Sequence, residues 1–432
     1  MGDSTVESRL HRFGERGLKW ALAPGALVIL YLFFGVFGIN YFSYPTLVNI
    51  VDAAYYFGFI AMGVTFVIIS GGIDLSIGTV MMCAAIIGGT ALKHGFPMVA
   101  SLLLIIAVGL AFGALNGLLV SRLKMPPFIV TLGTMMISMG VGSIVSNVAS
   151  ATFPIRGQPG GWFKSIFLYL AGNGTAIPTG ALLLAVVAVV CHLMLSNTKL
   201  GRYTYAIGSN LEAARLSGVD VKKWQMLVYV IAGGTAGIGG ISYAAIYTTV
   251  LPAQGQGFEL TAIAAAVIGG TSLSGGIGTI WGTIIGVFIM SVLATGLPSL
   301  NLEAHYQTFF TGVIVIGAVL LDMYRMRKAA EVRIETPADL YRKSMLEKIV
   351  AMRRELSTGR GGGNGQQAVA LRTRIAQARS ELKANFAQMK ANERADQARL
   401  RAEERAADRA SAEKELSRQG DPERRSKSRK HS

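Results

Sequence analysis

Charged residues and cysteines are scarce in this chain of 432 residues. Asp, Glu, Lys and Arg make up 15% of the sequence, whereas an ordinary soluble domain contains about 25%. This scarcity excludes a soluble enzyme and an intrinsically disordered chain. The two cysteines, Cys83 and Cys191, both lie in apolar runs. The sequence therefore offers neither a disulfide framework nor a cysteine-based metal site.

Several nucleotide-binding and catalytic motifs are also missing. No Gly-Lys dipeptide occurs, so the chain contains no Walker A loop and is not expected to bind ATP itself in the P-loop manner. The HExxH, paired CxxC and GxSxG motifs are absent as well. We predict no catalytic residue, no metal and no cofactor bound by this chain.

Apolar residues dominate the composition. They make up 51% of the sequence, and the mean hydropathy is +0.45. They fall into runs that are long enough to span a bilayer. This pattern predicts an all-α polytopic membrane protein with a transmembrane domain at 20–325. About ten transmembrane helices are expected, at 20–39, 47–69, 77–92, 97–120, 126–148, 178–195, 225–249, 259–271, 276–297 and 305–323.

The third and eighth predicted spans are short and interrupted by glycine. Such broken helices often line the path of a transporter, because irregular backbone survives in a bilayer only where protein or water covers it. The other interpretation is that these are ordinary helices, tilted or wrongly bounded. A weak internal repeat lies beside them. Residues 71–78, at the start of the third span, match residues 269–276, at the end of the eighth, at five of eight positions. Internal duplication and chance similarity of Gly-rich stretches both remain open.

Basic residues are distributed unevenly across the predicted membrane. With the N-terminus in the cytoplasm, only Lys93, Arg156 and Lys164 fall on the outer side, against fourteen Lys and Arg residues on the cytoplasmic side. This positive-inside bias favours an even number of spans with both termini cytoplasmic. Residues 1–19 are charged, and the apolar run after them lacks a small-residue cleavage site. We therefore expect a cytoplasmic N-terminal segment followed by an uncleaved anchor.

Ionisable side chains within the spans are few. We place Asp52, Asp74, His192 and Glu259 near span ends, whereas ion-coupled carriers usually keep such groups near the middle of the bilayer. The sequence therefore argues against ion coupling. Either a partner supplies the energy for transport, or the flow is passive.

The longest cytoplasmic loop of the transmembrane domain, 196–224, contains the signal of a short helix. Asn210 is suited to cap a helix that starts at Leu211, and Glu212 in its first turn suits the helix dipole. Gly218 is a natural terminator. A short helix that stands clear of the bilayer is what the transmission of force from a soluble partner needs. It is equally what a plain surface helix looks like.

These loop residues resemble the EAA–G loop of ABC importer permeases. The matching residues are Glu212-Ala213-Ala214 and, after three further residues, Gly218. The similarity extends to the ribose-type monosaccharide permeases over about residues 40–325. The stretches that carry it are 71–76, 127–134, 205–218, 258–265 and 269–276.

The resemblance implies a transport subunit of the bacterial inner membrane that performs no bond chemistry. Two permease chains, identical or related, would form the pore. A periplasmic binding protein would deliver ribose, galactose, xylose or a related polyol, and a cytoplasmic ATPase would carry the ATP and Mg²⁺. The residues carried over to an ATPase-coupling role are Asn210, Glu212, Ala213, Ala214, Arg215 and Gly218.

The same resemblance suggests two further sets of candidate residues, one for docking of the binding protein and one for the sugar path. The extracytoplasmic loop 149–177 carries Arg156, Trp162 and Lys164, which would meet acidic residues of the binding protein or simply form an ordinary polar loop. Polar side chains in apolar spans pair either with sugar hydroxyls or with neighbouring helices. The candidates for the sugar path are Asp74, Ser76, Asn116, Thr131, Thr134 and Ser272.

The C-terminal region departs from the compact pattern of the family. We expect a linker with a Gly-rich break at 326–366 and a cytoplasmic amphipathic helix at 367–418, either partly paired as in a coiled coil or fully solvated. The basic end, 419–432, is expected to be disordered and to touch anionic lipid, with no nucleic-acid partner. The apolar stripe of the helix consists of Leu371, Ile375, Ala378, Leu382, Phe386 and Met389.

Three functions therefore compete. The leading one is the membrane subunit of an ATP-driven monosaccharide importer. The others are a passive channel or ion-coupled carrier with a regulatory tail, and a membrane anchor whose tail scaffolds other proteins. The discriminating property is partnership, because only the first needs an ATPase and a binding protein.

Overall fold

The computed structural model describes residues 23–330, 337–357, 369–392, 395–396 and 399. The chain divides into two compact units, Met1–Lys328 and Ala329–Ser432. The predictions for 1–19 and 419–432 lie outside the described residues, and so does the part of the predicted C-terminal helix from 400 to 418.

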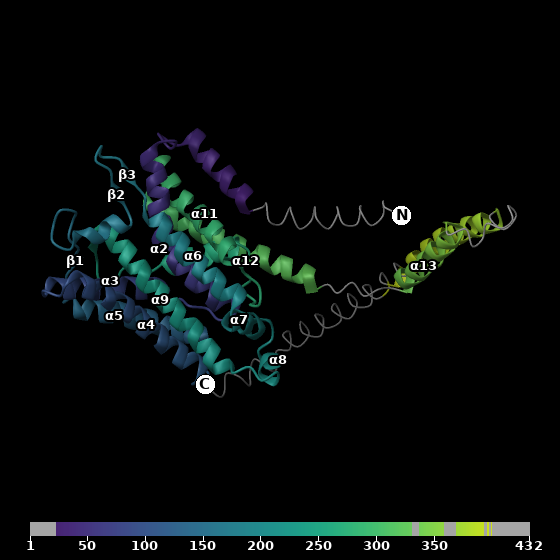
Figure 1. Ribbon diagram of the computed structural model, residues 1–432, viewed down its shortest axis with the longest axis horizontal. Helices are drawn as coiled ribbons and strands as arrows, with labels where there is room; N and C mark the ends of the chain where they lie inside the picture. Colours follow the sequence, from purple (N-terminus) through teal and green to yellow (C-terminus); the bar gives the residue numbers. More distant parts are fainter. Residues whose placement is uncertain (1–22, 331–336, 358–368, 393–394, 397–398, 400–432) are drawn as a thin grey trace, which may run out of the picture. The chain divides into compact units, whose positions relative to one another are not determined.

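The first unit is a bundle of helices that are apolar enough to cross a membrane (Figure 1). Seven of the described helices are of full spanning length, and three shorter apolar ones accompany them, so the predicted all-α polytopic class is confirmed. The long helices are α2 (Tyr44–Ile69), α4 (Met98–Ser121), α5 (Pro127–Val145), α6 (Gly180–Asn197), α9 (Val221–Tyr247), α11 (Ile280–Ser299) and α12 (Ala304–Ala330). The shorter ones are Ala23–Phe37, α3 (Ile77–Lys93) and α10 (Phe258–Ile268).

The remaining elements of this unit are short. On one side lie the 3-10 helix η1 (Gly161–Ile166) and two pairs of two-residue strands. The other side carries α7 (Lys199–Ser209) and α8 (Leu211–Leu216). The antiparallel pairs are β1 (Ala151–Thr152) with β4 (Thr249–Val250), and β2 (Tyr169–Leu170) with β3 (Ala176–Ile177). The first pair ties the loop after α5 to the end of α9.

Helix α2 forms the centre of the bundle. In its most apolar stretch 94% of the residues are buried, against 33% in α4 and in α5. The exposed side chains of the outer helices are themselves apolar, as expected where the surrounding solvent is lipid. Close approach of backbones holds α4 against α9, since a Cβ on Gly117 would lie 2.8 Å from Met226 O.

The N-termini of the two shorter helices α3, with 17 residues, and α10, with 11 residues, meet; we call these two the half-helices. A Cβ on Gly78, in the first turn of α3, would lie 2.5 Å from Gly255 O and 2.9 Å from the Cβ of Phe258. Phe258 packs on Phe57, midway along α2, with ring centroids 5.6 Å apart. Both N-termini therefore lie beside the middle of α2, and non-helical backbone at 70–76 and 251–257 leads to them. This arrangement is compatible with broken helices, and the prediction that these two spans line the path stays a prediction.

The structure corrects the expected depth of Glu259. We predicted it at an outer span end, but it lies in the first turn of α10 beside Gly78 and is 5% exposed. The reason is that residues 251–257 enter the bundle without forming a helix. The sequence argument against ion coupling therefore loses this support.

The helices that precede the two matched stretches, α2 and α10, end alike. After α2, Gly71 N donates to Ile68 O and Gly72 N to Val67 O. After α10, Gly270 N donates to Val267 O and Thr271 N to Ala266 O. Both helices thus end in the same turn, the Schellman motif, with a glycine of positive φ at its left-handed position. The turn pairs Gly71 with Gly270, whereas the sequence match paired Gly71 with Gly269. The shared turn is therefore out of register with the sequence match, and the duplication stays a prediction.

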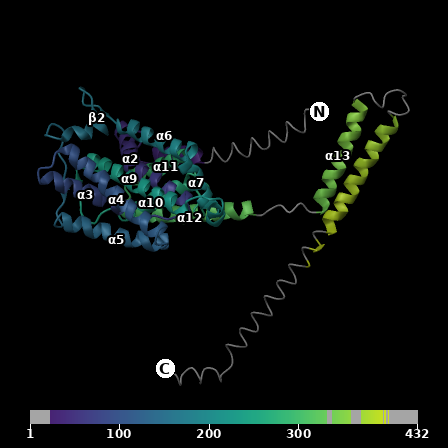
Figure 2. The same ribbon diagram turned by 60° about the horizontal axis from the view of Figure 1, so that its bottom comes forward.

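The second unit contains two helices that lie side by side, α13 (Pro337–Ser357) and residues 369–392 (Figure 2). Asn385 Nδ2 donates to Tyr341 Oη at 3.0 Å, and the guanidinium of Arg342 lies over the Phe386 ring. Helix α13 falls within the segment predicted as a linker. The side chains of the predicted stripe are buried or half-buried in this pair, namely Leu371, Ile375, Ala378, Leu382, Phe386 and Met389.

Candidate functional site

The predicted loop helix is present as α8. Asn210 has extended backbone with φ −162°, and its Oδ1 accepts from Ala213 N at 2.9 Å. Glu212 and Arg215 form an ion pair of 3.4 Å on the surface, with their side chains 64% and 63% exposed. Gly218 ends the segment at φ +83°, where its N donates to Arg215 O. The local sequence therefore specifies this helix through its cap and its terminator.

Helix α8 is an exposed, partly apolar knob at one end of the first unit (Figure 1). Leu216 is 82% exposed and Leu211 42%, while Ala214 faces inward and is buried. The helix contacts α7 and α9. Exposed leucines on a short capped helix suit the groove of a soluble partner.

Three of the predicted path residues form one buried network. Asp74 Oδ1 accepts from Ser76 N at 2.9 Å and from Ser76 Oγ at 2.7 Å. Asn116 Nδ2 on α4 donates to Ser76 Oγ at 2.9 Å. All three are at most 3% exposed, and Asn116 Oδ1 has no hydrogen-bond partner among the described residues. A buried acceptor without a partner is where a hydroxyl donor fits.

In the part of the chain that the structure describes, the other predicted path residues form no hydrogen bond to these three side chains, and only Thr131 lies next to them. Thr131 Oγ1 reaches Ile73 O at 3.4 Å, next to Asp74, but is closer to Pro127 O in its own helix, at 2.9 Å. Thr134 bonds only to carbonyls of its own helix α5 among the described residues. Ser272 Oγ donates to Asp322 Oδ2 on α12 at 3.0 Å, so it belongs to a separate contact.

Sequence reasoning missed Asp322. Its Oδ2 also accepts from Leu273 N at 3.0 Å, so α12 holds the loop that follows α10. The aspartate follows an apolar run inside the predicted span 305–323, and we did not single it out. A lone acidic residue ahead of Arg325 and Arg327 was the available signal.

The two buried carboxylates near the start of the half-helices serve as local caps. Glu259 accepts from Gly257 N at 2.9 and 3.0 Å, while Asp74 accepts from Ser76. Neither forms an ion pair with any residue that the structure describes. Carboxylates at such N-termini place acceptors beside the positive ends of two helices. No group of three or more metal-ligating side chains occurs within the described residues.

Lys164 ties loop 149–177 to the end of α9, whereas Arg156 bonds within the loop. Lys164 is 7% exposed, and its ammonium donates to Thr248 Oγ1 at the end of α9. Burial lowers the pKa of Lys164, and the charge of Arg156 lowers it further. Arg156 is half-buried and donates to Leu168 O, whereas Trp162 is 53% exposed. Of the three predicted docking residues, Trp162 is therefore the most accessible.

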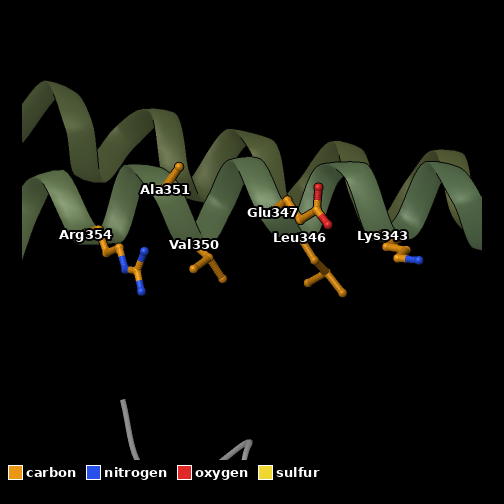
Figure 3. A pocket seen from close by; sticks show the side chains of 6 residues that line it. All are labelled: Lys343, Leu346, Glu347, Val350, Ala351 and Arg354. Carbon is orange, nitrogen blue, oxygen red and sulfur yellow. The ribbon is translucent and has the colours of Figure 1, made fainter.

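A hollow on the second unit holds none of the predicted site residues. Its side chains follow one face of α13 (Figure 3), with the exposed Leu346 and Val350 between charged neighbours. The lining residues are Lys343, Leu346, Glu347, Val350, Ala351 and Arg354. A mixed, open helix face of this kind suits packing against another helix more than enclosure of a solute.

Comparison with known proteins decides the family. Residues 46–319 match the family described as branched-chain amino acid transport system / permease component. The ribose import permease protein RbsC of Escherichia coli (strain K12) is 34% identical over 324 residues, which cover 74% of this chain and 99% of that protein. The chain belongs to the ribose-type ABC importer permeases.

Other relatives of this chain are named as permeases for different solutes. The fructose import permease protein FrcC of Rhizobium meliloti is 32% identical, covering 76% of this chain and 91% of its own. The autoinducer 2 import system permease protein LsrC of Yersinia pseudotuberculosis is 33% identical, covering 71% and 85%. No solved structure matches the chain. Membership makes the chain a multi-pass membrane permease and leaves its solute open.

Proposed function

We propose that this chain is the membrane-spanning subunit of an ATP-driven importer of a monosaccharide or related polyol. Its family and the ribose, fructose and autoinducer 2 permeases among its relatives support an import role for a small polyhydroxylated solute. Both termini and α8 would lie in the cytoplasm, as the distribution of basic residues favours.

The observation that carries the proposal is α8. Glu212-Ala213-Ala214 and Gly218 form a capped, solvent-exposed helix whose leucines point outward. A separate ATPase subunit, which would hold ATP and Mg²⁺, docks on this helix and drives the transport cycle. The chain itself contains no P-loop sequence to bind ATP.

The network of Asp74, Ser76 and Asn116 supports a hydroxylated solute. It presents the unpartnered Asn116 Oδ1 beside a carboxylate that is not neutralised by a described cation. Sugar hydroxyls donate hydrogen bonds, and acceptors of this kind bind them. We assign the sugar path to these residues and to Thr131, which lies next to them.

Two partners complete the proposed importer on the outer side and within the membrane. A periplasmic sugar-binding protein would dock on loop 149–177, with Trp162 as the exposed aromatic contact. A second permease chain, the same or related, would cover part of the apolar surface of the outer helices.

Reconstitution tests the proposal. The chain is purified together with its ATPase and binding protein, placed in liposomes and assayed with a panel of ribose, fructose, galactose and xylose. We expect sugar uptake only with ATP and all three components, and loss of uptake when Glu212 or Gly218 is replaced. Solute accumulation by vesicles that hold this polypeptide alone would contradict the proposal.

One observation favours a second candidate, an ion-coupled carrier. Glu259 is buried beside the middle of α2, where coupling carboxylates are usually found. An ion-coupled carrier would lose uptake when the ion gradient is collapsed and would not need ATP. Uptake that survives both the ionophore and the Glu259→Gln change discards this candidate.

A further inference from the structure

Three segments of backbone meet at a junction of four glycines, Gly71, Gly208, Gly275 and Gly276. The contact joins the end of α2, the end of α7 and the loop after α10. Gly276 N donates to Ile69 O at 2.9 Å, so the loop after α10 is hydrogen-bonded to the end of α2. We call this contact the glycine junction.

Gly208 occupies the centre of the glycine junction. A Cβ at this position would overlap Ile69 O and lie 2.6 Å from Gly276 N. From the other side, a Cβ on Gly275 would lie 2.8 Å from Gly208 O and 3.1 Å from Gly71 Cα. No residue other than glycine fits here without a shift of backbone. Since backbone touches backbone, no flexible side chain absorbs a displacement.

The glycine junction is one residue away from the N-cap of α8. Only Ser209 separates Gly208 from Asn210, the N-cap of α8, and α7 stays helical up to Ser209. One turn earlier, Tyr205 Oη donates to Gly278 O at 2.7 Å, which fixes the same helix to the loop after α10. A displacement of α8 therefore reaches the glycine junction through a short rigid connection.

On its other side the glycine junction is connected to the hydrogen-bonded network of Asp74, Ser76 and Asn116, which we call the path network. Gly71 begins the loop that carries Asp74 and Ser76, and Ser76 is bonded to Asn116. The loop after α10 is held from outside by Asp322. One end of the loop that carries the network is therefore in contact with Gly208.

We infer that Gly208 is a positioning residue that transmits movement of α8 to the loops after α2 and α10. The inference rests on the proposed function, since it assumes that an ATPase moves α8. It adds a specific route: α8 to Gly208, then Ile69 and Gly71, then Asp74 and Ser76. Close packing alone is the competing explanation, as at Gly109 of α4, where an added Cβ would overlap Gly233 O.

The test compares sugar transported per ATP hydrolysed in the reconstituted complex, using the sugar that the panel identifies. Gly208→Ala changes the junction, Gly109→Ala creates a comparable overlap between α4 and α9, and Gly140→Ala adds a Cβ with nothing within 4 Å. We expect Gly208→Ala to lower this ratio by about tenfold while ATP hydrolysis persists, within the range for residues that carry coupling. Gly109→Ala should lower thermal stability and leave the ratio unchanged.

Tyr205→Phe keeps the test decisive if Gly208→Ala does not fold. This change removes only the hydroxyl bonded to Gly278 O and should lower the ratio by about two- to threefold. An unchanged ratio in Tyr205→Phe and in any folded Gly208→Ala protein overturns the inference, as does an equal fall in Gly109→Ala. A wild-type complex without ATP-dependent uptake refutes the proposed function itself, which is a different result.

Discussion

The side chain of Asn210 caps the six residues of α8. Its Oδ1 satisfies Ala213 N, one of the amide groups that a helix start leaves without a partner. The Glu212–Arg215 pair adds little, because it is exposed and screened, and Ala214 is the one buried side chain of the helix. At the scale of the residue, therefore, one hydrogen bond carries much of the local order.

Asn210→Ala should loosen α8 and weaken coupling. Loss of an N-cap costs about 0.5–2 kcal/mol of helix stability, which is large for a helix of six residues. Amide hydrogen exchange over 210–218 should accelerate, and ATP-dependent uptake should fall. Asn210→Asp keeps the acceptor and is the matched control. Equal exchange in both variants would show that the cap is dispensable.

Asn116→Ala should reduce sugar uptake without unfolding the protein. The change removes both the unpartnered Oδ1 and the bond to Ser76 Oγ, and we expect the concentration for half-maximal transport to rise by about fivefold or more. Thr134→Val is the control, since this hydroxyl bonds only to its own helix among the described residues. The assignment fails if the two variants transport alike.

Lys164→Met should remove a pH-dependent cost of folding. Burial first, and then Arg156, lowers the pKa of Lys164 from 10.5 in the folded protein. The unfolded protein therefore binds more protons just below pH 10.5, and wild-type stability rises with pH there. Well below the folded pKa both states are protonated, and the cost is constant. As the pH rises from about 7 to 10, the Tm of the wild type should approach the Tm of Lys164→Met. A constant difference in Tm over this range would contradict the prediction.

At the scale of the element, the half-helices matter most. Helices α3 and α10 begin beside the middle of α2, so their N-termini and capping carboxylates lie inside the bundle. Non-helical backbone leads to each of them; it is largely buried at 70–76, whereas Leu251, Ala253 and Gln256 are exposed in the segment before α10. This geometry brings the polar acceptors of the path to one level of the fold.

Gly113→Ala should destabilise the α4–α9 pair. A methyl group there would overlap Tyr229 O, and such overpacking costs about 1–3 kcal/mol. The intrinsic helix preference for alanine works the other way by about 1 kcal/mol. Thermal unfolding should therefore show a lower Tm for Gly113→Ala and an equal or higher Tm for Gly140→Ala. A higher Tm in both variants would mean that α4 and α9 separate enough to accept the methyl group, which contradicts the prediction.

Sequence reasoning predicted the elements whose causes are local. Apolar runs gave the spans to within a few residues, and Asn210 with Gly218 gave α8. It failed where the cause is distant along the chain. The depth of Glu259 depends on how 251–257 threads between other helices, and the burial of Lys164 depends on the pairing of β1 with β4. The contact of Ser272 with Asp322 spans 50 residues and has no local pattern.

At the scale of the whole molecule, the chain extends well beyond the part that matches its relatives. The ribose permease of Escherichia coli matches over 99% of its length with 74% of this chain, and the family match ends at residue 319. The second unit begins at Ala329. Transport and the C-terminal helices are thus separable in sequence.

Truncation after Lys328 should leave transport intact. The first unit contains the path network, the glycine junction and α8, and its helices pack among themselves. We expect ATP-dependent uptake within about twofold of the full chain, since a domain with its own core can in principle fold alone. Uptake rate and size-exclusion profile measure the two properties. Loss of uptake with an unchanged profile would instead assign the second unit a role in the cycle.

The central burial of α2 has a consequence for how the protein is made. Its main neighbours, α9 and α11, lie more than 150 residues later in the chain. At about 5–20 residues per second, roughly 10–30 s pass before α9 emerges from the ribosome. During that interval α2 exposes Tyr55, Thr65 and its glycines to lipid. We therefore expect α2 to need shelter, from an insertase or a neighbouring helix, until its partners arrive.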